Sequence, residues 1–157
     1  MRKFCLLIIP LLAMSMACKN KSQTPAKPVT KHWLEGLWKA NVPEGFAEYA
    51  WTHPYYGQWD MQCKIIPVTG EPYAGERKEI RKVEGGYKLT IFMGNQTQEL
   101  MSKSADEAGF DFENEQNALI STVRIIRESD QNYRQVMYKK AVGDQREMRT
   151  YSFTRVQ

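Results

Sequence analysis

Apolar and polar residues alternate with a period of two along most of the chain beyond residue 32. Trp59, Met61 and Cys63, for example, alternate with Asp60 and Gln62. This period places successive side chains on opposite faces of a β-strand, so one face is expected to be buried and the other solvated. The pattern predicts nine strands, at 36–42, 59–65, 76–83, 87–93, 97–103, 110–113, 119–128, 133–142 and 146–156.

Short turn sequences rich in Gly, Asn and Asp separate these segments. Examples are 84–86, 94–95, 129–132 and 143–144. Because no helical period of any length interrupts the strands, they are expected to meander through short connections. The predicted fold is therefore all-β: an antiparallel up-and-down barrel of about eight to nine strands, whose closure removes exposed edges. A β-sandwich is the alternative.

The first residues have the pattern of an export signal. Arg2 and Lys3 precede a mostly apolar stretch, 4–16, which is too short for a permanent transmembrane helix. The segment 15–18, Ser-Met-Ala-Cys, resembles the lipobox of bacterial lipoproteins. The resemblance implies removal of 1–17 as a signal peptide and attachment of lipid, including an acyl chain such as palmitate, to Cys18. The alternative is a plain secreted protein.

Charge is distributed unevenly along the chain. Residues 1–31 contain six Lys or Arg and no acidic residue, whereas 32–157 contain 16 basic and 18 acidic residues. The basic excess thus belongs to the leader and to a polar tether at 18–31, and we expect no nucleic-acid partner. The expected organisation is signal peptide, tether and a domain at 32–157, anchored in the cell envelope to a membrane, which we take to be the outer one.

The start of the domain resembles that of the lipocalins and related calycin barrels. His32 to Lys39 contains Gly-x-Trp at Gly36 and Trp38. The resemblance implies that Trp38 closes one end of a barrel and that a basic residue of the last strand, for which we choose Arg155, packs across it. It also implies a long lid loop between the first two strands, at Pro43 to Gly57.

The expected lid contains the strongest candidate for a ligand site. Five aromatic residues fall within eleven positions there, close to His53: Phe46, Tyr49, Trp51, Tyr55 and Tyr56. Aromatic rings over a barrel mouth suit apolar ligands or sugar faces. The alternative is that the rings plug the barrel or pack on its outside.

The barrel interior is the second candidate site, and it either holds one small ligand or is filled by side chains. Its expected lining is Trp38, Met61, Cys63, Leu89, Ile91, Phe110, Val123, Ile125 and Met137. Cys63 is interpreted as a core residue and not as a nucleophile paired with His53, because its period places it inside. The charged segment 76–82 is interpreted as a mixed-sign surface.

Enzymatic signatures are missing from the sequence. No nucleophile elbow, phosphate loop or zinc-protease motif occurs, and the two His and the acidic stretch at 106–115 do not have metal-ligand spacing. We therefore expect no catalysis, cofactor or metal. The first functional hypothesis is a membrane-anchored, non-catalytic binding protein for a small hydrophobic molecule or a glycan. The alternative is a solid barrel that docks or inhibits another envelope protein.

Overall fold

The computed structural model describes residues 31–102, 105–106, 109–114, 119–139 and 147–157. These residues contain eleven strands and no helix, so no helix is present there that could cross a membrane. The strands are β1 (Gly36–Val42), β2 (Gly45–Tyr55), β3 (Gln58–Pro67), β4 (Tyr73–Val83), β5 (Gly86–Met93), β6 (Gln96–Ser102), β7 (Ala105–Asp106), β8 (Gly109–Glu113), β9 (Ile120–Arg127), β10 (Asn132–Lys139) and β11 (Met148–Arg155).

The strands form a closed antiparallel barrel, which confirms the predicted fold class. Each of β1 to β5 pairs with the strand that follows it, β1 also pairs with β11, and the order continues through β10 and β9 to β8. The pairing of Met101 with Glu113, between β6 and β8, closes the ring. Ten strands make this ring, slightly more than expected, and the two-residue β7 pairs only with β8.

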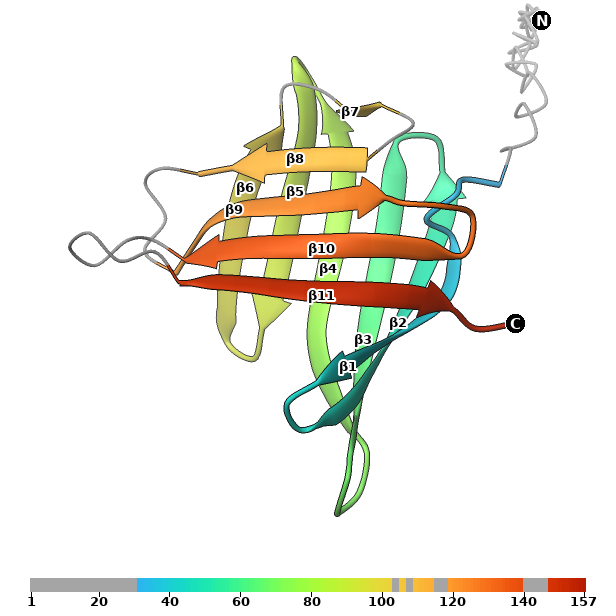
Figure 1. Ribbon diagram of the computed structural model, residues 1–157. Helices are drawn as coiled ribbons and strands as arrows, with labels where there is room; N and C mark the ends of the chain where they lie inside the picture. Colours follow the sequence, from blue (N-terminus) through green and yellow to red (C-terminus); the bar gives the residue numbers. More distant parts are fainter. Residues whose placement is uncertain (1–30, 103–104, 107–108, 115–118, 140–146) are drawn as a thin grey trace, which may run out of the picture.

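Figure 1 shows β8–β11 crossing in front of β3–β6 at a steep angle, so the interior lies between two groups of strands. The barrel has two ends. The capped end carries the β2–β3, β4–β5 and β9–β10 turns and the segment 31–35, and the far end carries the β1–β2, β3–β4 and β5–β6 turns. The β5–β6 turn contains Gly94 at φ 58°, a left-handed conformation that glycine adopts without strain.

Inward-facing side chains occupy the interior as the alternation predicts. All nine residues of the expected lining lie inside: eight are buried, and Met137 is half-buried against the same cluster. Trp38, Met61, Leu89, Ile91, Val123 and Ile125 are completely inaccessible to solvent. Burial of such side chains contributes roughly 1.5–3 kcal/mol each, so this cluster is the main source of the barrel's stability.

The predicted lid loop after the first strand is wrong. Residues 45–55 form β2, which pairs with β1 from Gly45 to Trp51, and a tight turn at Pro43 and Glu44 replaces the loop. The period of two was hidden because Phe46 and Ala50, on the outer face, are apolar like the inner residues. The pairing of β2 with β3 shifts register between Thr52 and Tyr55, around Pro54, which has no N–H for the ladder.

Candidate functional site

The five aromatic residues expected on a lid lie on opposite faces of the barrel wall. Tyr49 and Trp51 point inward and are 5% and 1% exposed. Phe46 lies on the outer face, where the Lys39 Nζ is 4.1 Å from its ring centre. Tyr55 and Tyr56 are exposed at the β2–β3 turn of the capped end. The structure therefore does not bring these five side chains together as one site.

Arg155 and Trp38 form the contact expected at the capped end. The guanidinium carbon lies 4.2 Å from the Trp38 ring centre, and the same guanidinium donates hydrogen bonds to the carbonyls of Trp33, Glu35 and Asp130 at 2.5, 2.8 and 3.1 Å. Gly36 has φ 132°, and a Cβ there would lie 2.6 Å from an Arg155 nitrogen. Glycine is thus required both by the backbone and by the close approach of the guanidinium.

A second set of rings fills the interior behind this contact. The His53 ring stacks on Trp59 with centres 4.8 Å apart, and His32 packs against Trp59 at 4.9 Å and Phe110 at 6.1 Å. Burial, followed by the charges of His53 and Arg127, lowers the pKa of His32 to about 4. Burial also lowers the pKa of His53. Both imidazoles are therefore neutral at pH 7, and the capped half of the barrel is filled.

A polar group that the sequence did not suggest lies deeper in the barrel. It consists of Glu76 and Lys78 of β4, Tyr49 of β2 and Gln135 of β10. Lys78 is completely buried; its ammonium pairs with the Glu76 carboxylate and donates to Gln135 Oε1 at 3.1 Å and Tyr49 OH at 3.5 Å. The Tyr49 hydroxyl donates to Glu76 Oε1 at 2.5 Å. Opposite charge and hydrogen bonds offset the cost of removing the ammonium from water.

The two charges hold the protonation states of this group. Burial by itself would raise the pKa of Glu76, but the Lys78 ammonium and the hydrogen bonds from Lys78 and Tyr49 outweigh it, and the net pKa is lowered. Burial and the adjacent Glu76 carboxylate raise the pKa of Tyr49 well above its usual value. At neutral pH the Glu76 carboxyl group is therefore ionised and the Tyr49 phenol is neutral.

The pairing of β3 with β4 is irregular beside Glu76. The β3–β4 register shifts between Gln62 and Lys64, so Gly75 and Glu76 together lie opposite Cys63. A Cβ at Gly75 would lie 2.6 Å from the Cys63 sulfur, so the residue must be small. Burial, followed by the Glu76 charge, raises the pKa of the Cys63 thiol to about 11. The thiol is protonated at neutral pH, in agreement with the expected core role.

Two buried amides of the interior, one in contact with this group and one on β6, have polar atoms without a hydrogen-bond partner among the described residues. Gln135 Nε2 has no partner among the described residues, although Gln135 is fully buried. Gln98 of β6 is 4% exposed, and neither its nitrogen nor its oxygen has a partner there. Buried polar atoms are nearly always hydrogen-bonded, because each one left unpaired costs roughly 1–3 kcal/mol. A bound molecule or an ordered water at these amides would supply the missing hydrogen bonds.

Apolar side chains surround the interior between this polar group and the far end. They are half-buried and pack against the core: Val42, Ile65, Met93, Met137 and Tyr151. A polar centre with an apolar surround is the usual composition of a small-molecule site, in which a few polar groups orient a ligand and apolar contacts hold it. Methionine side chains also adapt to ligands of different shapes.

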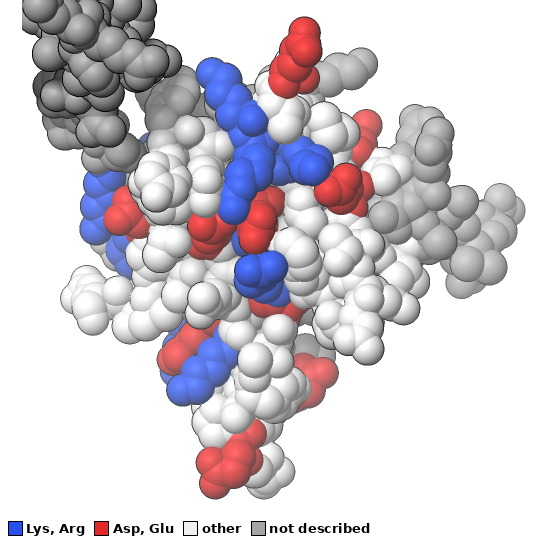
Figure 2. Space-filling model, turned by 180° about the vertical axis from the view of Figure 1, so that it is seen from behind, with Lys and Arg blue, Asp and Glu red and all other residues white. Residues whose placement is uncertain are grey.

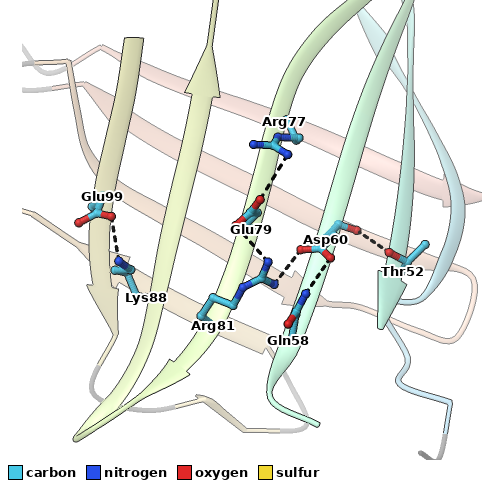
Figure 3. A network of polar contacts seen from close by, with 8 residues as sticks. All are labelled: Thr52, Gln58, Asp60, Arg77, Glu79, Arg81, Lys88 and Glu99. Carbon is cyan, nitrogen blue, oxygen red and sulfur yellow. Dashed lines mark hydrogen bonds and ion pairs between the residues drawn. The ribbon is translucent and has the colours of Figure 1, made fainter. Parts of the chain in front are cut away.

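The outer face of β2–β6 carries the mixed-sign surface expected for 76–82. Figure 2 shows basic and acidic side chains interspersed over this side of the barrel. In Figure 3, Arg81 lies between Asp60 and Glu79, with nitrogen–oxygen distances of 2.7 and 3.1 Å. Lys88 and Glu99 pair at 2.9 Å between β5 and β6. Solvent-accessible pairs of this kind stabilise little, but charges along strands discourage association with other sheets.

The interpretation of 76–82 was wrong for Glu76 and Lys78, which point inward. The signal that could have found them is Ile80. An apolar residue among charged ones sets the inward phase of the strand, and the period of two then places Lys78 and Glu76 on the same face. Gln98 and Gln135 also have the inward phase of β6 and β10, beside Leu100 and Tyr133.

The described part of the chain contains no candidate metal site. No group of three or more His, Cys, Asp or Glu side chains there could hold a metal ion. Comparison with models of known protein families and with curated proteins finds no match. The polar group and its two neighbouring amides are therefore interpreted from their own geometry.

Proposed function

We propose that this chain is a membrane-anchored lipoprotein of the bacterial cell envelope that binds a small, mainly apolar molecule inside its barrel without chemical turnover. The observation that carries the proposal is the pair of buried amides, Gln98 and Gln135, whose unpaired polar atoms lie on the same inner face as the Lys78–Glu76 pair. The half-buried apolar residues towards the far end supply the contact area. Burial of apolar surface would provide affinity, and the polar group would orient the ligand.

The mode of binding differs from the one expected from the sequence. Of the aromatic candidates, Tyr49 belongs to the polar group, whereas Trp51 is a core residue whose indole donates to Tyr133 OH at 3.3 Å. We therefore expect Trp51→Ala to destabilise the domain by about 3–5 kcal/mol, the usual cost of removing a buried Trp. Urea denaturation of this variant would measure it. A fully stable Trp51→Ala domain would contradict the core role.

The anchor is a separate part of the proposal. A lipid on Cys18, following removal of 1–17, would hold the domain through the 18–31 tether. Because residue 31 adjoins the capped end, the tether would join the domain at that end. The chain should incorporate labelled palmitate, and the labelled protein should sediment with the outer-membrane fraction. Loss of both in Cys18→Ala is expected, and unchanged labelling in that variant would refute the lipidation.

Native mass spectrometry of the full chain, purified in detergent from a bacterial host, tests the binding function. We expect additional mass that disappears on denaturation. Met137→Trp, which places a larger side chain among the half-buried apolar residues, should remove this mass. The matched control is Met101→Trp, because Met101 is 49% exposed on the outer face. Equal retention of the ligand by both variants would place binding outside the barrel.

The alternative, a docking module for another envelope protein, is favoured by Tyr55 and Tyr56. They are 68% and 79% exposed at the capped end, and the Lys82 Nζ lies 5.0 Å from the Tyr56 ring centre. Exposed tyrosines are typical of protein-binding hot spots. A partner from envelope extract that is retained in high salt, and lost in the double variant Tyr55→Ala/Tyr56→Ala, would support this alternative over ligand binding.

A further inference from the structure

Strand pairing and one hydrogen bond connect the buried polar side chains through Lys78. Lys78 pairs in register with Ile91 of β5, and Ile91 pairs with Gln98 of β6. Two strand spacings place Gln98 about 10 Å from Lys78 along this row. Gln135 reaches the same level from the facing strand β10, where it contacts Lys78. The unused amide atoms therefore lie on two strands that Lys78 connects, β6 through the row of paired residues and β10 through its hydrogen bond.

The orientation of the Gln135 amide follows from its contact with Lys78. An ammonium can only donate hydrogen bonds, so the Gln135 oxygen must face Lys78, as the 3.1 Å contact shows. The amide nitrogen is consequently the free end, with no partner among the described residues. Gln135 thus presents donors to whatever occupies the interior.

Gln98 offers both kinds of hydrogen bond. Its oxygen and nitrogen are buried and unpaired within the described part of the chain. A primary amide with both ends free has one acceptor and two donors side by side. The group that best satisfies such an edge has a donor and an acceptor in adjacent positions, as another amide, a lactam or an imide has.

The charges of the site are already balanced. Each contact of the Lys78 ammonium is made within the protein, to Glu76, Gln135 and Tyr49, so no free cation is left to receive an anionic ligand. An incoming anion would also meet the Glu76 carboxylate. An incoming cation would find that carboxylate already occupied by Lys78 and Tyr49. Burying an uncompensated charge is costly, so either ionic ligand is disfavoured.

We propose that the ligand of the barrel interior is a neutral molecule with an amide-type donor–acceptor edge, seated on Gln98 and Gln135. This inference rests on the proposed binding function and specifies its chemistry. The apolar remainder of the ligand extends towards the half-buried residues of the far end, such as Met93 and Met137.

Three probes with the same carbon skeleton test the proposal: hexanamide, hexanoate and hexylamine, which are neutral, anionic and cationic at pH 7. Each is titrated calorimetrically into the full chain in lipid nanodiscs, with empty nanodiscs as the blank. We expect hexanamide to bind at least about tenfold more tightly than the two ionic probes, the ratio that corresponds to about 1.4 kcal/mol.

The outcomes separate the inference from the function on which it rests. Preference for hexanamide supports both. Binding of hexanoate or hexylamine as tight as that of hexanamide would overturn the amide-type ligand and leave a binding function in place. No heat beyond the blank for any of the three probes would refute both.

The variant Gln98→Met assigns the preference to this site. Methionine retains the length of glutamine and removes both hydrogen-bonding ends, so the advantage of hexanamide should fall about tenfold, the loss expected for one buried hydrogen-bonded edge. The matched control is Gln62→Met on the outer face of β3, where glutamine is exposed. An unchanged preference in Gln98→Met would overturn the assignment to Gln98, and the wild-type comparison of the probes does not depend on how this variant folds.

Discussion

The unpaired amide of Gln98 predicts that removing it stabilises the ligand-free domain. Gln98 is 4% exposed, and both ends of its amide have no partner among the described residues. Each unpaired buried polar group costs roughly 1–3 kcal/mol, and a methionine of similar length would fill the same space with apolar atoms. We therefore expect Gln98→Met to raise the free energy of unfolding by about 1–3 kcal/mol.

Thermal unfolding of the ligand-free full chain, followed by circular dichroism, would measure this effect. A domain of this size shifts by about 4 °C per kcal/mol, so the Tm should rise by about 4–12 °C. Gln62→Met, the exposed control, should change stability by less than about 0.5 kcal/mol. A Gln98→Met variant with a lower Tm would refute the reasoning, because it would show that the amide is hydrogen-bonded in the free protein.

Three further predictions concern the charged and aromatic contacts. Lys78→Met should destabilise the domain by about 3–5 kcal/mol in urea denaturation, because it leaves the Glu76 carboxylate buried without its cation. The double variant Lys78→Met/Glu76→Gln should recover part of this loss. Equal stability of the single and double variants would contradict the pairing of Lys78 with Glu76. Arg155→Ala should cost about 2–4 kcal/mol through its backbone hydrogen bonds and its contact with Trp38, with the exposed Arg149→Ala near zero as the control. The pKa of His32 is lowered from 6.5 to about 4, so between these two pH values the unfolded chain binds a proton that the folded chain does not bind. The stability of the domain should therefore fall as the pH decreases from about 6.5 to 4. In the variant His32→Asn the Tm should depend less on pH in that window, and a pH profile identical to that of the wild type would contradict the pKa shift.

The barrel could be predicted because its strands alternate clearly where one face is charged and the other apolar, as in 59–65. β2 was missed because Phe46 and Ala50 make its outer face apolar as well, so the period of two has little contrast. The reverse happened in β4, where charges on both faces suggested a solvated strand while Lys78 was buried. Periodicity detects a difference in polarity between the two faces of a strand. In β2 and β4 the two faces are similar in polarity, so the period gives little signal.

The capped end was easier to predict than the polar group. The Gly-x-Trp sequence at Gly36 and Trp38 predicted that a basic residue of the last strand packs across the indole. Arg155 makes this contact in the structure. The polar group depends on pairing between strands that are far apart in sequence: Lys78 and Gln135 are 57 residues apart. The hydrogen bond between Tyr49 and Glu76 likewise joins residues that are 27 positions apart. Local sequence contains no record of either relation.

The pairing of the first strand with the last has a consequence for how the chain acquires its structure. The Arg155 guanidinium bonds to Glu35, 120 residues earlier, and β1 and β11 pair at Trp38 and Arg155. Contacts between residues so far apart in sequence require a large loss of chain entropy before they contribute to stability, which slows folding. A chain synthesised or exported from its N-terminus cannot close the barrel until its final residues are available. Until then, the edge of β1 would remain exposed, which makes protection against aggregation a requirement of the chain's biogenesis.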